Sequence, residues 1–466
     1  MTHTAVAVAA LVGLAAVGAA ATPSHEPLRL HPDNPHYFLW RGKPTVLITS
    51  GEHYGAVLNL DFDYGPYLAE LERHGLNLTR TFSGVYREIP GSFKIAGNPL
   101  APKPNRYICP WSRTKTKGYY DGGGKFDLSK WDEAYFARLK DFLAQASRRG
   151  VVVELVLFCP MYNDPLWKAC PMNAANNVNG AGKVGAKQAH TLTNGGLLEY
   201  QVAVTRKIVT ACNAFDNLYY EICNEPYFGG VTLAWQHRIA KTIVETEKGL
   251  PRKHLIAQNI SNGSKQVTNP NPAVSIFNFH YCSPPKAVAM NWGLARPIGD
   301  DETGFKGSND VPYRPDGWDF ILAGGAVYSN LDYSFTPDAE DGSATPKAPG
   351  GGGTGLRKAL GRLKRFIEGF DFVRMAPDDS CIKSGPAKKA TARALVEKGK
   401  QYAVFVRGGT KTDLVLDLPK GAYRAEWVNT LTGKVDKREA FQHGGGATTL
   451  ASPKYDGEIA VGVVGK

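Results

Sequence analysis

Two acidic residues, Glu225 and Glu302, stand at the ends of apolar runs in this sequence. Glu225 belongs to Asn224-Glu225-Pro226, which follows the strand-like segment LYYEIC, and Pro226 ends that strand because it cannot donate to a sheet ladder. An ionised carboxylate is costly to bury, so a glutamate at the tip of an apolar strand needs a reason. A facing pair of carboxyl groups, one protonated and one ionised, is what cleavage of a glycosidic bond requires.

Other polar side chains follow the remaining apolar runs, and we expect them to surround this pair. The candidate substrate contacts are Asn224, Arg80, His280, Tyr281, Glu52, His53, Asp332 and Trp167. Some of them also have a structural interpretation. Arg80 could be a buried partner of Glu221, the residues Glu52, His53 and Asp332 could belong to core polar networks, and Trp167 could pack beneath its loop.

Eight strand-like runs position these residues, and several are continuous in Val, Ile and Leu, as strands buried on both faces are. They cover residues 45–50, 76–82, 151–158, 218–225, 254–261, 275–281, 297–302 and 326–335. Helical patterns lie between them, and a closing helix is predicted at 355–369. The order predicts a (β/α)8 barrel, an α/β fold, because a doubly wound sheet does not need an eighth strand. Strand ends four and seven then face each other across the barrel mouth.

The clearest helical pattern follows the second strand. Trp131, Tyr135, Leu139 and Phe142 recur at helical spacing, with Ser129 as the predicted N-cap and Gly150 after the end.

Three segments are predicted along the chain. Residues 1–21 are apolar, rich in small residues and end in Ala19-Ala20-Ala21, which predicts a signal peptide and a secreted or periplasmic protein; a buried helix is the alternative. Residues 22–370 form the barrel. Residues 371–466 carry short alternating strands with Gly and Pro turns, which predicts an antiparallel β-sandwich.

Composition limits the classes of function. The 466 residues, 43% hydrophobic and 21% charged, are typical of a folded protein of two domains. The net charge of +12 is accompanied by no nucleic-acid-binding motif. No later apolar run is long enough to span a membrane. The composition therefore gives no reason to expect a nucleic-acid partner. The two-carboxyl chemistry leads us to expect a monomer whose partner is a polysaccharide or oligosaccharide.

Cysteine and histidine spacing predicts no metal site, and the two-carboxyl chemistry needs no cofactor. The seven cysteines are an odd number, so at least one thiol is unpaired within the chain. Cys159 and Cys170 flank a short loop and are candidates for a disulfide in an oxidising compartment.

Asn224-Glu225-Pro226 ending strand four, with Glu302 ending strand seven, resembles the clan A glycoside hydrolases, which include the cellulase-like family 5 enzymes. The resemblance implies a retaining double displacement with Glu225 as acid/base and Glu302 as nucleophile. It also implies that Asn224 binds the sugar 2-hydroxyl, that Arg80 keeps the nucleophile ionised, and that Tyr281 donates to it. The overall plan also resembles apiosidase-like barrels with a C-terminal β-sandwich.

The sequence departs from the family pattern at three places. His280 and Tyr281 are adjacent, where the family has one residue between them, so which one faces the site is open. The tryptophan that usually ends strand eight is missing, with Tyr333 or Phe335 as replacements. Asp300 and Asp301 beside Glu302 could also take the nucleophile's place.

The expected function is a secreted retaining glycoside hydrolase acting on β-linked glycans of plant or microbial origin. The rival interpretation is a non-hydrolytic, sugar-binding barrel on the cell surface. Retention predicts that the carboxyl groups of Glu225 and Glu302 lie about 5–5.5 Å apart. We also expect the charge of Glu302 to raise the pKa of Glu225.

Overall fold

The computed structural model of the chain describes residues 25–386 and 389–466, and the predicted signal peptide lies outside the described residues. Its central sheet has eight parallel strands in the order β4-β13-β12-β11-β10-β9-β8-β5, so the predicted (β/α)8 barrel is confirmed. The strands are β4 (Leu47–Gly51), β5 (Leu78–Phe82), β8 (Val152–Phe158), β9 (Leu218–Cys223), β10 (Ile256–Asn262), β11 (Ile276–His280), β12 (Ile298–Thr303) and β13 (Val327–Leu331).

The two ends of the sheet, β4 and β5, meet through the side chain of Asn77. Its Nδ2 donates to the carbonyl of Val46 at 2.8 Å, and its Oδ1 accepts from the amide of Ile48 at 3.0 Å. The backbone amide of Asn77 also donates to the carbonyl of Ile48 at 3.2 Å. A side-chain amide thus supplies hydrogen bonds at the point where the barrel closes.

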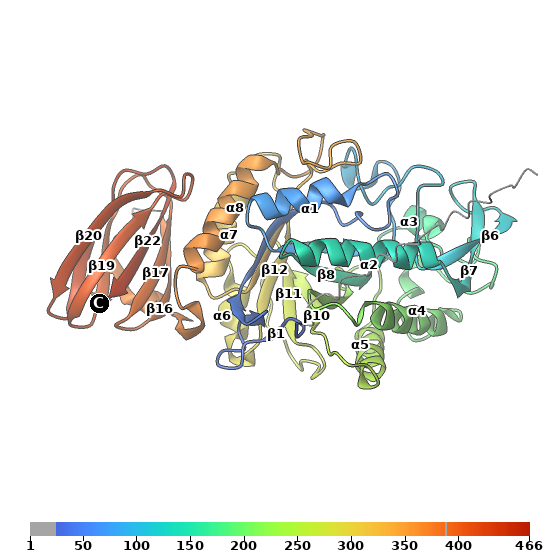
Figure 1. The fold of residues 1–466 in the computed structure, drawn as a ribbon, viewed down its shortest axis with the longest axis horizontal. Coiled ribbons are helices and arrows are strands. Elements are labelled where there is room, and N and C mark those ends of the chain that lie inside the picture. Colours follow the sequence, from blue (N-terminus) through green and yellow to red (C-terminus); the bar gives the residue numbers. More distant parts are fainter. Residues whose placement is uncertain (1–24, 387–388) are drawn as a thin grey trace, which may run out of the picture.

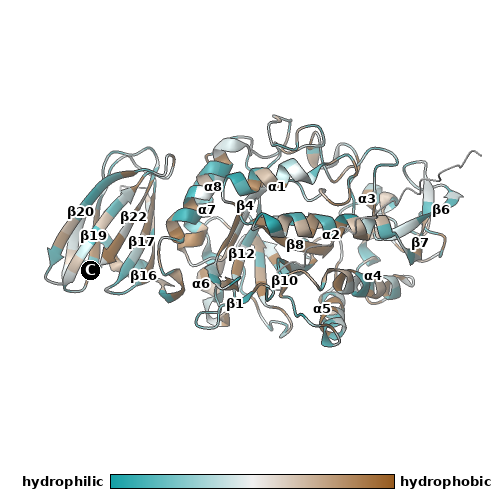
Figure 2. Cartoon of the chain, in the orientation of Figure 1, coloured by the Kyte–Doolittle hydropathy of each residue, from teal (hydrophilic) through white to brown (hydrophobic). Residues whose placement is uncertain are grey.

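Helices surround the barrel. They are α1 (Tyr64–Arg73), α2 (Glu133–Arg148), α3 (Asp164–Ala169), α4 (Leu197–Cys212), α5 (Leu233–Lys248), α6 (Lys286–Asn291), α7 (Tyr313–Leu322) and α8 (Thr354–Ile367). Short 3₁₀ turns cover Ser92–Lys94, Ala186–Gln188, Trp292–Leu294, Phe372–Arg374 and Asp379–Cys381. Figure 2 shows hydrophobic and hydrophilic residues alternating around α2, as expected of a helix with one face on the core.

The predicted start of α2 is wrong. Trp131 belongs to β7 (Gly124–Trp131), which forms a hairpin with β6 (Trp111–Lys117) in the connection between β5 and α2. Asp132, not Ser129, is the N-cap, because its side chain accepts from the amides of Ala134 and Tyr135. Gly150 follows the helix with a φ of 69°, a left-handed conformation that suits glycine.

One connection of the barrel contains no helix. Residues 263–275, between β10 and β11, are rich in Asn, Pro and Ser and form turns and irregular structure. These residue types favour turns over helix interiors, which accounts for the difference from the expected alternation.

A small N-terminal sheet covers the floor of the barrel. It consists of β1 (Arg29–Leu30), β2 (Phe38–Trp40) and β3 (Lys43–Thr45). Trp40 Nε1 donates to Asp216 Oδ2 at 3.2 Å, and Arg41 pairs with the same carboxylate at 2.7 Å. Because Asp216 precedes β9, this sheet lies at the amino-terminal ends of the strands, away from the predicted site.

The C-terminal region forms the predicted antiparallel β-sandwich. One sheet has the order β14-β16-β17-β22-β19-β20 and the other β15-β18-β21. The strands are β14 (Ala376–Pro377), β15 (Ile382–Ser384), β16 (Thr391–Glu397), β17 (Gln401–Arg407), β18 (Asp413–Leu418), β19 (Gly421–Val428), β20 (Val435–His443), β21 (Gly446–Ala451) and β22 (Glu458–Gly465).

The sandwich lies at one end of the molecule beside α7, and the β6–β7 hairpin lies at the other (Figure 1). Phe405 of β17 stacks on Trp318 of α7, with ring centroids 5.6 Å apart. Ion pairs surround this stack, since Arg407 contacts Asp316 at 2.8 Å and Asp319 at 3.1 Å. The larger sheet therefore has one face on the barrel and one on the smaller sheet.

The described part of the chain contains neither a membrane-spanning helix nor a disulfide. No helix within it is long and apolar enough to cross a membrane. The seven cysteines all lie within it, and each is buried and unpaired, so the predicted bridge between Cys159 and Cys170 is wrong.

Candidate active site

A cavity of about 510 Å³ opens at the carboxyl-terminal ends of the barrel strands. Most of its wall is aromatic or apolar, with a few polar groups, as is typical of a small-molecule site. Its lining residues are His53, Tyr54, Phe82, Glu88, Phe93, Leu100, Cys159, Tyr162, Asn224, Glu225, Phe228, Asn262, Tyr281, Glu302, Phe305 and Lys306. Both predicted catalytic glutamates are among them.

The strand ends bend to bring these residues together. Tyr54, Glu225 and Tyr281 have φ values of 55°, 35° and 53°, which are uncommon for residues other than glycine. The register between strands also shifts at Phe279/His280 and between Asp300 and Thr303. In a regular strand adjacent side chains point to opposite faces, so these irregularities let neighbours such as His280 and Tyr281 both reach the site.

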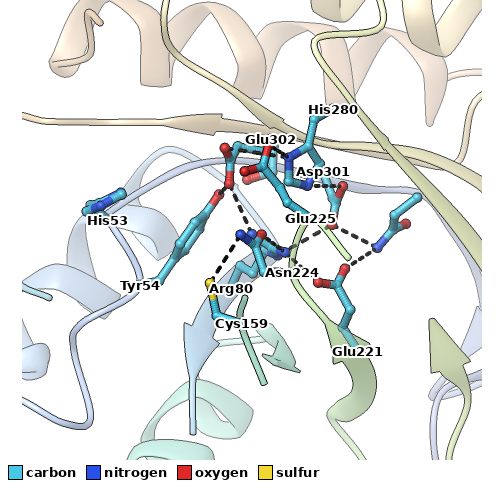
Figure 3. Close-up of polar contacts among 12 residues, drawn as sticks. His53, Tyr54, Arg80, Cys159, Glu221, Asn224, Glu225, His280, Asp301 and Glu302 are labelled. Atoms are coloured by element: carbon cyan, nitrogen blue, oxygen red, sulfur yellow. Dashed lines mark hydrogen bonds and ion pairs between the residues drawn. The ribbon is translucent and has the colours of Figure 1, made fainter. Parts of the chain in front are cut away.

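Glu302 accepts hydrogen bonds from three side chains, and Figure 3 shows two of the donors, Tyr54 and Arg80. Tyr54 Oη donates to Oε2 at 2.9 Å, and Tyr281 Oη donates to Oε1 at 2.5 Å. Arg80 Nη1 donates to Oε2 at 3.3 Å. The three donors lie in or after different barrel strands and together fix the orientation of the Glu302 carboxyl group.

Glu225 accepts from a separate set of donors. Tyr162 Oη donates to Oε2 at 2.7 Å, Tyr227 Oη donates to Oε1 at 3.3 Å, and His280 Nδ1 lies 3.2 Å from Oε1. Burial alone would raise the pKa of Glu225, but His280 and the two tyrosines outweigh it and lower that pKa. The expectation that Glu302 raises the pKa of Glu225 is therefore wrong for the unliganded site.

The two carboxyl groups are close. One oxygen of Glu225, one of Glu302 and one nitrogen of His280 all lie within 4.8 Å of one another. His280 Nδ1 is 3.2 Å from Glu225 Oε1 and 3.5 Å from Glu302 Oε1, so the imidazole lies against both glutamates (Figure 3). Its Nε2 lies 3.4 Å from Asp301 Oδ1.

Arg80 is completely buried beneath the pocket and contacts several acids at once. Its Nη2 donates to Glu221 Oε1 at 2.5 Å and to Asn224 Oδ1 at 2.8 Å. Its Nε lies 3.4 Å from Asp301 Oδ2, while Nη1 reaches Glu302. From the sequence, Arg80 was either a buried partner of Glu221 or a partner of the proposed nucleophile. In the structure its guanidinium contacts both Glu221 and Glu302.

The pKa values of the acids around Arg80 are shifted in opposite directions. Burial raises the pKa of Glu154 to about 8, and burial with the charge of Glu154 raises that of Asp301. Burial would also raise the pKa of Glu221, but Arg80 outweighs it and lowers that pKa. Asn278 Nδ2 donates to all three of these acids at 2.7–3.0 Å. Arg80 and Glu221 therefore form the ion pair at the centre of this cluster.

Only the last of the three consecutive acids on β12 lines the pocket. Asp301 points into the barrel interior, and Asp300 accepts from the amide of Cys282 at 3.2 Å. Glu302 is the acid that faces Glu225.

Several predicted substrate contacts lie elsewhere. Glu52 accepts from the amides of Gly55 and Ala56, and burial raises its pKa to about 7. Asp332 is fully buried, 2.7 Å from Arg357. Trp167 donates to the carbonyl of Val184 at 2.8 Å and packs beneath its loop. None of the three lines the cavity, whereas His53 does.

Three phenylalanines of the cavity wall were not singled out from the sequence, whereas Tyr281 was. Phe93, Phe228 and Phe305 line the cavity and keep 38%, 43% and 41% of their surface exposed, respectively. Tyr333 and Phe335, the suggested replacements for the missing tryptophan, are buried and do not line it. The exposed phenylalanines stand in the connections between barrel strands, Phe93 in the 3₁₀ turn Ser92–Lys94, where no periodicity identifies them. Tyr54, directly after Glu52-His53, could have been found from its place at a strand end.

Two groups of three side chains in the described part of the chain bring potential metal ligands within 4.8 Å. They are Glu225, His280 and Glu302 in the pocket, and Glu154, Glu221 and Asp301 below it. In the second group Arg80, which is not one of the three potential ligands, already pairs with Glu221.

No protein-family model matches this sequence, and no curated protein matches it. Solved structures share its fold. A provisional glycoside hydrolase from Bacteroides vulgatus aligns with a TM-score of 0.69 and 16% identity over 95% of this chain and 83% of its own. A glycoside hydrolase family 5 protein from the same species gives 0.64 and 13% over 94% of both chains. A family 30 xylanase from Clostridium acetobutylicum gives 0.50 and 11% over 94% of this chain and 100% of its own. The fold that the resemblance implied is confirmed.

Proposed function

We propose that the protein is a secreted glycoside hydrolase that cleaves β-linked glycans of plant or microbial origin with retention of configuration. The observation that carries the proposal is the pair Glu225 and Glu302, with carboxylate oxygens within 4.8 Å of each other at the barrel mouth. Retaining enzymes separate their carboxyl groups by about 5–5.5 Å, whereas inverting enzymes leave about 6.5–9.5 Å for a water. The apolar segment at residues 1–21 supports secretion.

In the first step Glu302 attacks the anomeric carbon and forms a glycosyl ester, while the bond to the leaving oxygen breaks. Glu225 gives its proton to that oxygen. Tyr54, Tyr281 and Arg80 donate hydrogen bonds to Glu302 and orient it for the attack. Asn224, which lines the cavity and is held by Arg80, is placed to bind the sugar 2-hydroxyl.

In the second step water replaces the ester oxygen of Glu302 at the anomeric carbon, and Glu225 takes the proton of that water. Glu302 carries no charge while it is esterified. Of the two glutamates, only Glu225 can then be an anion, and His280 lies against it. The interactions that lower the pKa of Glu225 favour its ionised form, which is the form that this step requires.

The proposed chemistry belongs to the barrel, residues 22–370, and it requires no metal or cofactor. The sandwich, residues 371–466, has a stabilising or glycan-binding role, because it contributes no side chain to the cavity lining.

Turnover by two alanine variants tests the proposal. Glu302→Ala stops release of reducing ends from every polysaccharide and aryl glycoside that the wild type cleaves. Glu225→Ala keeps activity on aryl glycosides with activated leaving groups, which need little protonation, and azide speeds release of the trapped glycosyl group with retained configuration. Glu199→Ala, at an exposed acid on α4, behaves as the wild type.

Two outcomes contradict the proposal. Normal turnover by Glu302→Ala removes the nucleophile assignment. Binding of glycans by the wild type without any release of reducing ends favours the rival function, a non-hydrolytic sugar-binding barrel.

A further inference from the structure

Two polar side chains in the cavity wall take no part in the proposed reaction. Glu88, in the connection after β5, and His53, in the connection after β4, both line the cavity. Glu88 is 2% exposed and His53 is 6% exposed, so the protein has removed both from bulk water. Burying such groups is unfavourable unless they are compensated by partners.

Glu88 is held rigidly and keeps acceptor capacity. Asn98 Nδ2 donates to its Oε2 at 2.5 Å, and Tyr86 Oη donates to its Oε1 at 3.3 Å. Its backbone amide donates to the carbonyl of Leu100 at 2.8 Å, which fixes the loop beside the cavity. An ionised carboxylate has about four acceptor positions, so about two stay available to a ligand.

His53 has no hydrogen bond to either ring nitrogen among the described residues. Its Nε2 lies 3.4 Å from Glu88 Oε1, close enough for electrostatic attraction but without hydrogen-bond geometry. Burial would lower the pKa of His53, yet the charges of Glu88, Glu302 and Glu52 outweigh it and raise that pKa. In Figure 3 the ring lies beyond Tyr54, apart from the contacts around the two proposed catalytic glutamates.

We propose that Glu88 and His53 bind two adjacent hydroxyl groups of a neutral sugar ring in the cavity, and that Glu88 excludes sugars carrying a carboxylate or sulfate there. The inference rests on the proposed function, since it names the substrate class of that same site. Each sugar hydroxyl both donates and accepts. One hydroxyl can therefore donate to the carboxylate of Glu88 while its neighbour accepts from the imidazole of His53.

The chemistry of the pair favours a neutral ligand. The cavity wall holds three carboxyl groups, those of Glu88, Glu225 and Glu302, and its one lysine, Lys306, is 2.6 Å from Asp316. An anionic group beside Glu88 would face like charge in a site shielded from water, where repulsion is strong. Hydroxyl groups instead satisfy acceptors that would otherwise be left unpaired.

A panel of 4-nitrophenyl β-glycosides tests the inference: glucoside, galactoside, mannoside, xyloside and glucuronide. The wild type is expected to cleave at least one neutral glycoside and not the glucuronide. On the neutral substrate, Glu88→Gln and His53→Ala lower kcat/KM by about 10- to 100-fold, the loss for a hydrogen bond to a charged group. Glu247→Gln is the matched control, because Glu247 forms a buried pair with His254 away from the cavity.

Deoxy analogues of the substrate distinguish a direct contact between Glu88 and a sugar hydroxyl from an effect of Glu88 on folding. On the monodeoxy substrate that lacks the hydroxyl bound by Glu88, the wild type and Glu88→Ala have equal kcat/KM, since no interaction is left to lose. If Glu88 had only a structural role, the kcat/KM of Glu88→Ala would stay below that of the wild type on the deoxy substrate as well.

Three results overturn the inference. Glu88→Gln and His53→Ala with wild-type kcat/KM remove it, and so does a wild type that prefers the glucuronide. If no glycoside is cleaved, calorimetry with the corresponding methyl glycosides decides, and no binding in the millimolar range overturns it. Failure of the proposed function is recognised separately, by normal turnover of Glu302→Ala.

Discussion

His280 is the residue that connects the two glutamates of the pocket. Its Nδ1 lies 3.2 Å from Glu225 and 3.5 Å from Glu302, and Asp301 lies behind its other nitrogen. In the proposed reaction Glu225 must be protonated before the first step and ionised before the second. Because His280 lowers the pKa of Glu225, it favours the second of these states.

The first prediction concerns pH. In the free enzyme kcat/KM falls as pH rises through the pKa of the acid, and for Glu225 this pKa lies below the ordinary value of 4.5. His280→Asn removes the main lowering interaction, so burial dominates and the alkaline limb moves to higher pH. The measurement is kcat/KM against pH with an alkyl glycoside, whose leaving group needs protonation. His254→Asn, at a buried histidine outside the cavity, leaves the limb in place. If the alkaline limb of His280→Asn lies at the same pH as that of the wild type, His280 does not lower the pKa of Glu225.

At the residue scale, the sequence identified the side chains that follow strand ends and missed those that the loops supply. Glu225, Glu302 and Asn224 were predicted to face one another because parallel strands end on one side of a barrel. Phe93 and Phe228 could not be predicted, because their places depend on how long loops fold over the mouth. Asp332 was predicted to contact substrate because it follows a strand, as Glu225 does. In the structure it is paired with Arg357 in the core and does not line the cavity.

At the element scale, the barrel depends on local irregularities at both ends of its strands. Register shifts near His280 and Glu302 orient the site, and Asn77 joins the two edges of the sheet. The eight strands were predictable because their Val, Ile and Leu runs reflect burial on both faces. The register shifts between strands could not be predicted, because no residue type marks their positions.

The second prediction tests the closure of the barrel. Asn77→Ala removes the partners of the Ile48 amide and the Val46 carbonyl, at a cost of about 1–3 kcal/mol for each buried group. Urea-induced unfolding measures the loss. Asn309→Ala, at an exposed loop position, changes the free energy of unfolding by less than about 0.5 kcal/mol. Equal stability of Asn77→Ala and the wild type would show that the side chain is dispensable for closure.

At the scale of the whole molecule, the β-sandwich is packed against the barrel as part of one structure. Phe405 and Trp318 stack between the two parts, and Asp316 links Arg407 of the sandwich to Lys306 of the cavity wall. The sandwich itself was predictable from alternating strands with Gly and Pro turns. Which of its faces meets the barrel was not, since the central strands β17 and β22 are buried on both faces.

The third prediction tests this packing. Phe405 is fully buried, so Phe405→Ala lowers the free energy of unfolding by about 3–5 kcal/mol. The folded variant keeps the kcat/KM of the wild type, because the residue lies outside the cavity lining. Phe441→Ala, at a half-buried position of β20, has a smaller effect on stability. A large fall in kcat/KM of folded Phe405→Ala would indicate that the sandwich takes part in catalysis.

The central claim is that Glu302 forms a covalent bond to the sugar. A panel of 2-deoxy-2-fluoro-β-glycosyl fluorides tests it most directly, because the fluorine at C2 disfavours the oxocarbenium-like transition state and the fluoride leaving group still allows the ester to form. Peptide mapping by mass spectrometry of the inactivated protein then identifies the labelled residue. The account predicts one added glycosyl group on Glu302. A label on Asp300, Asp301 or Glu225, or an inverted product from the unmodified substrate, would contradict it.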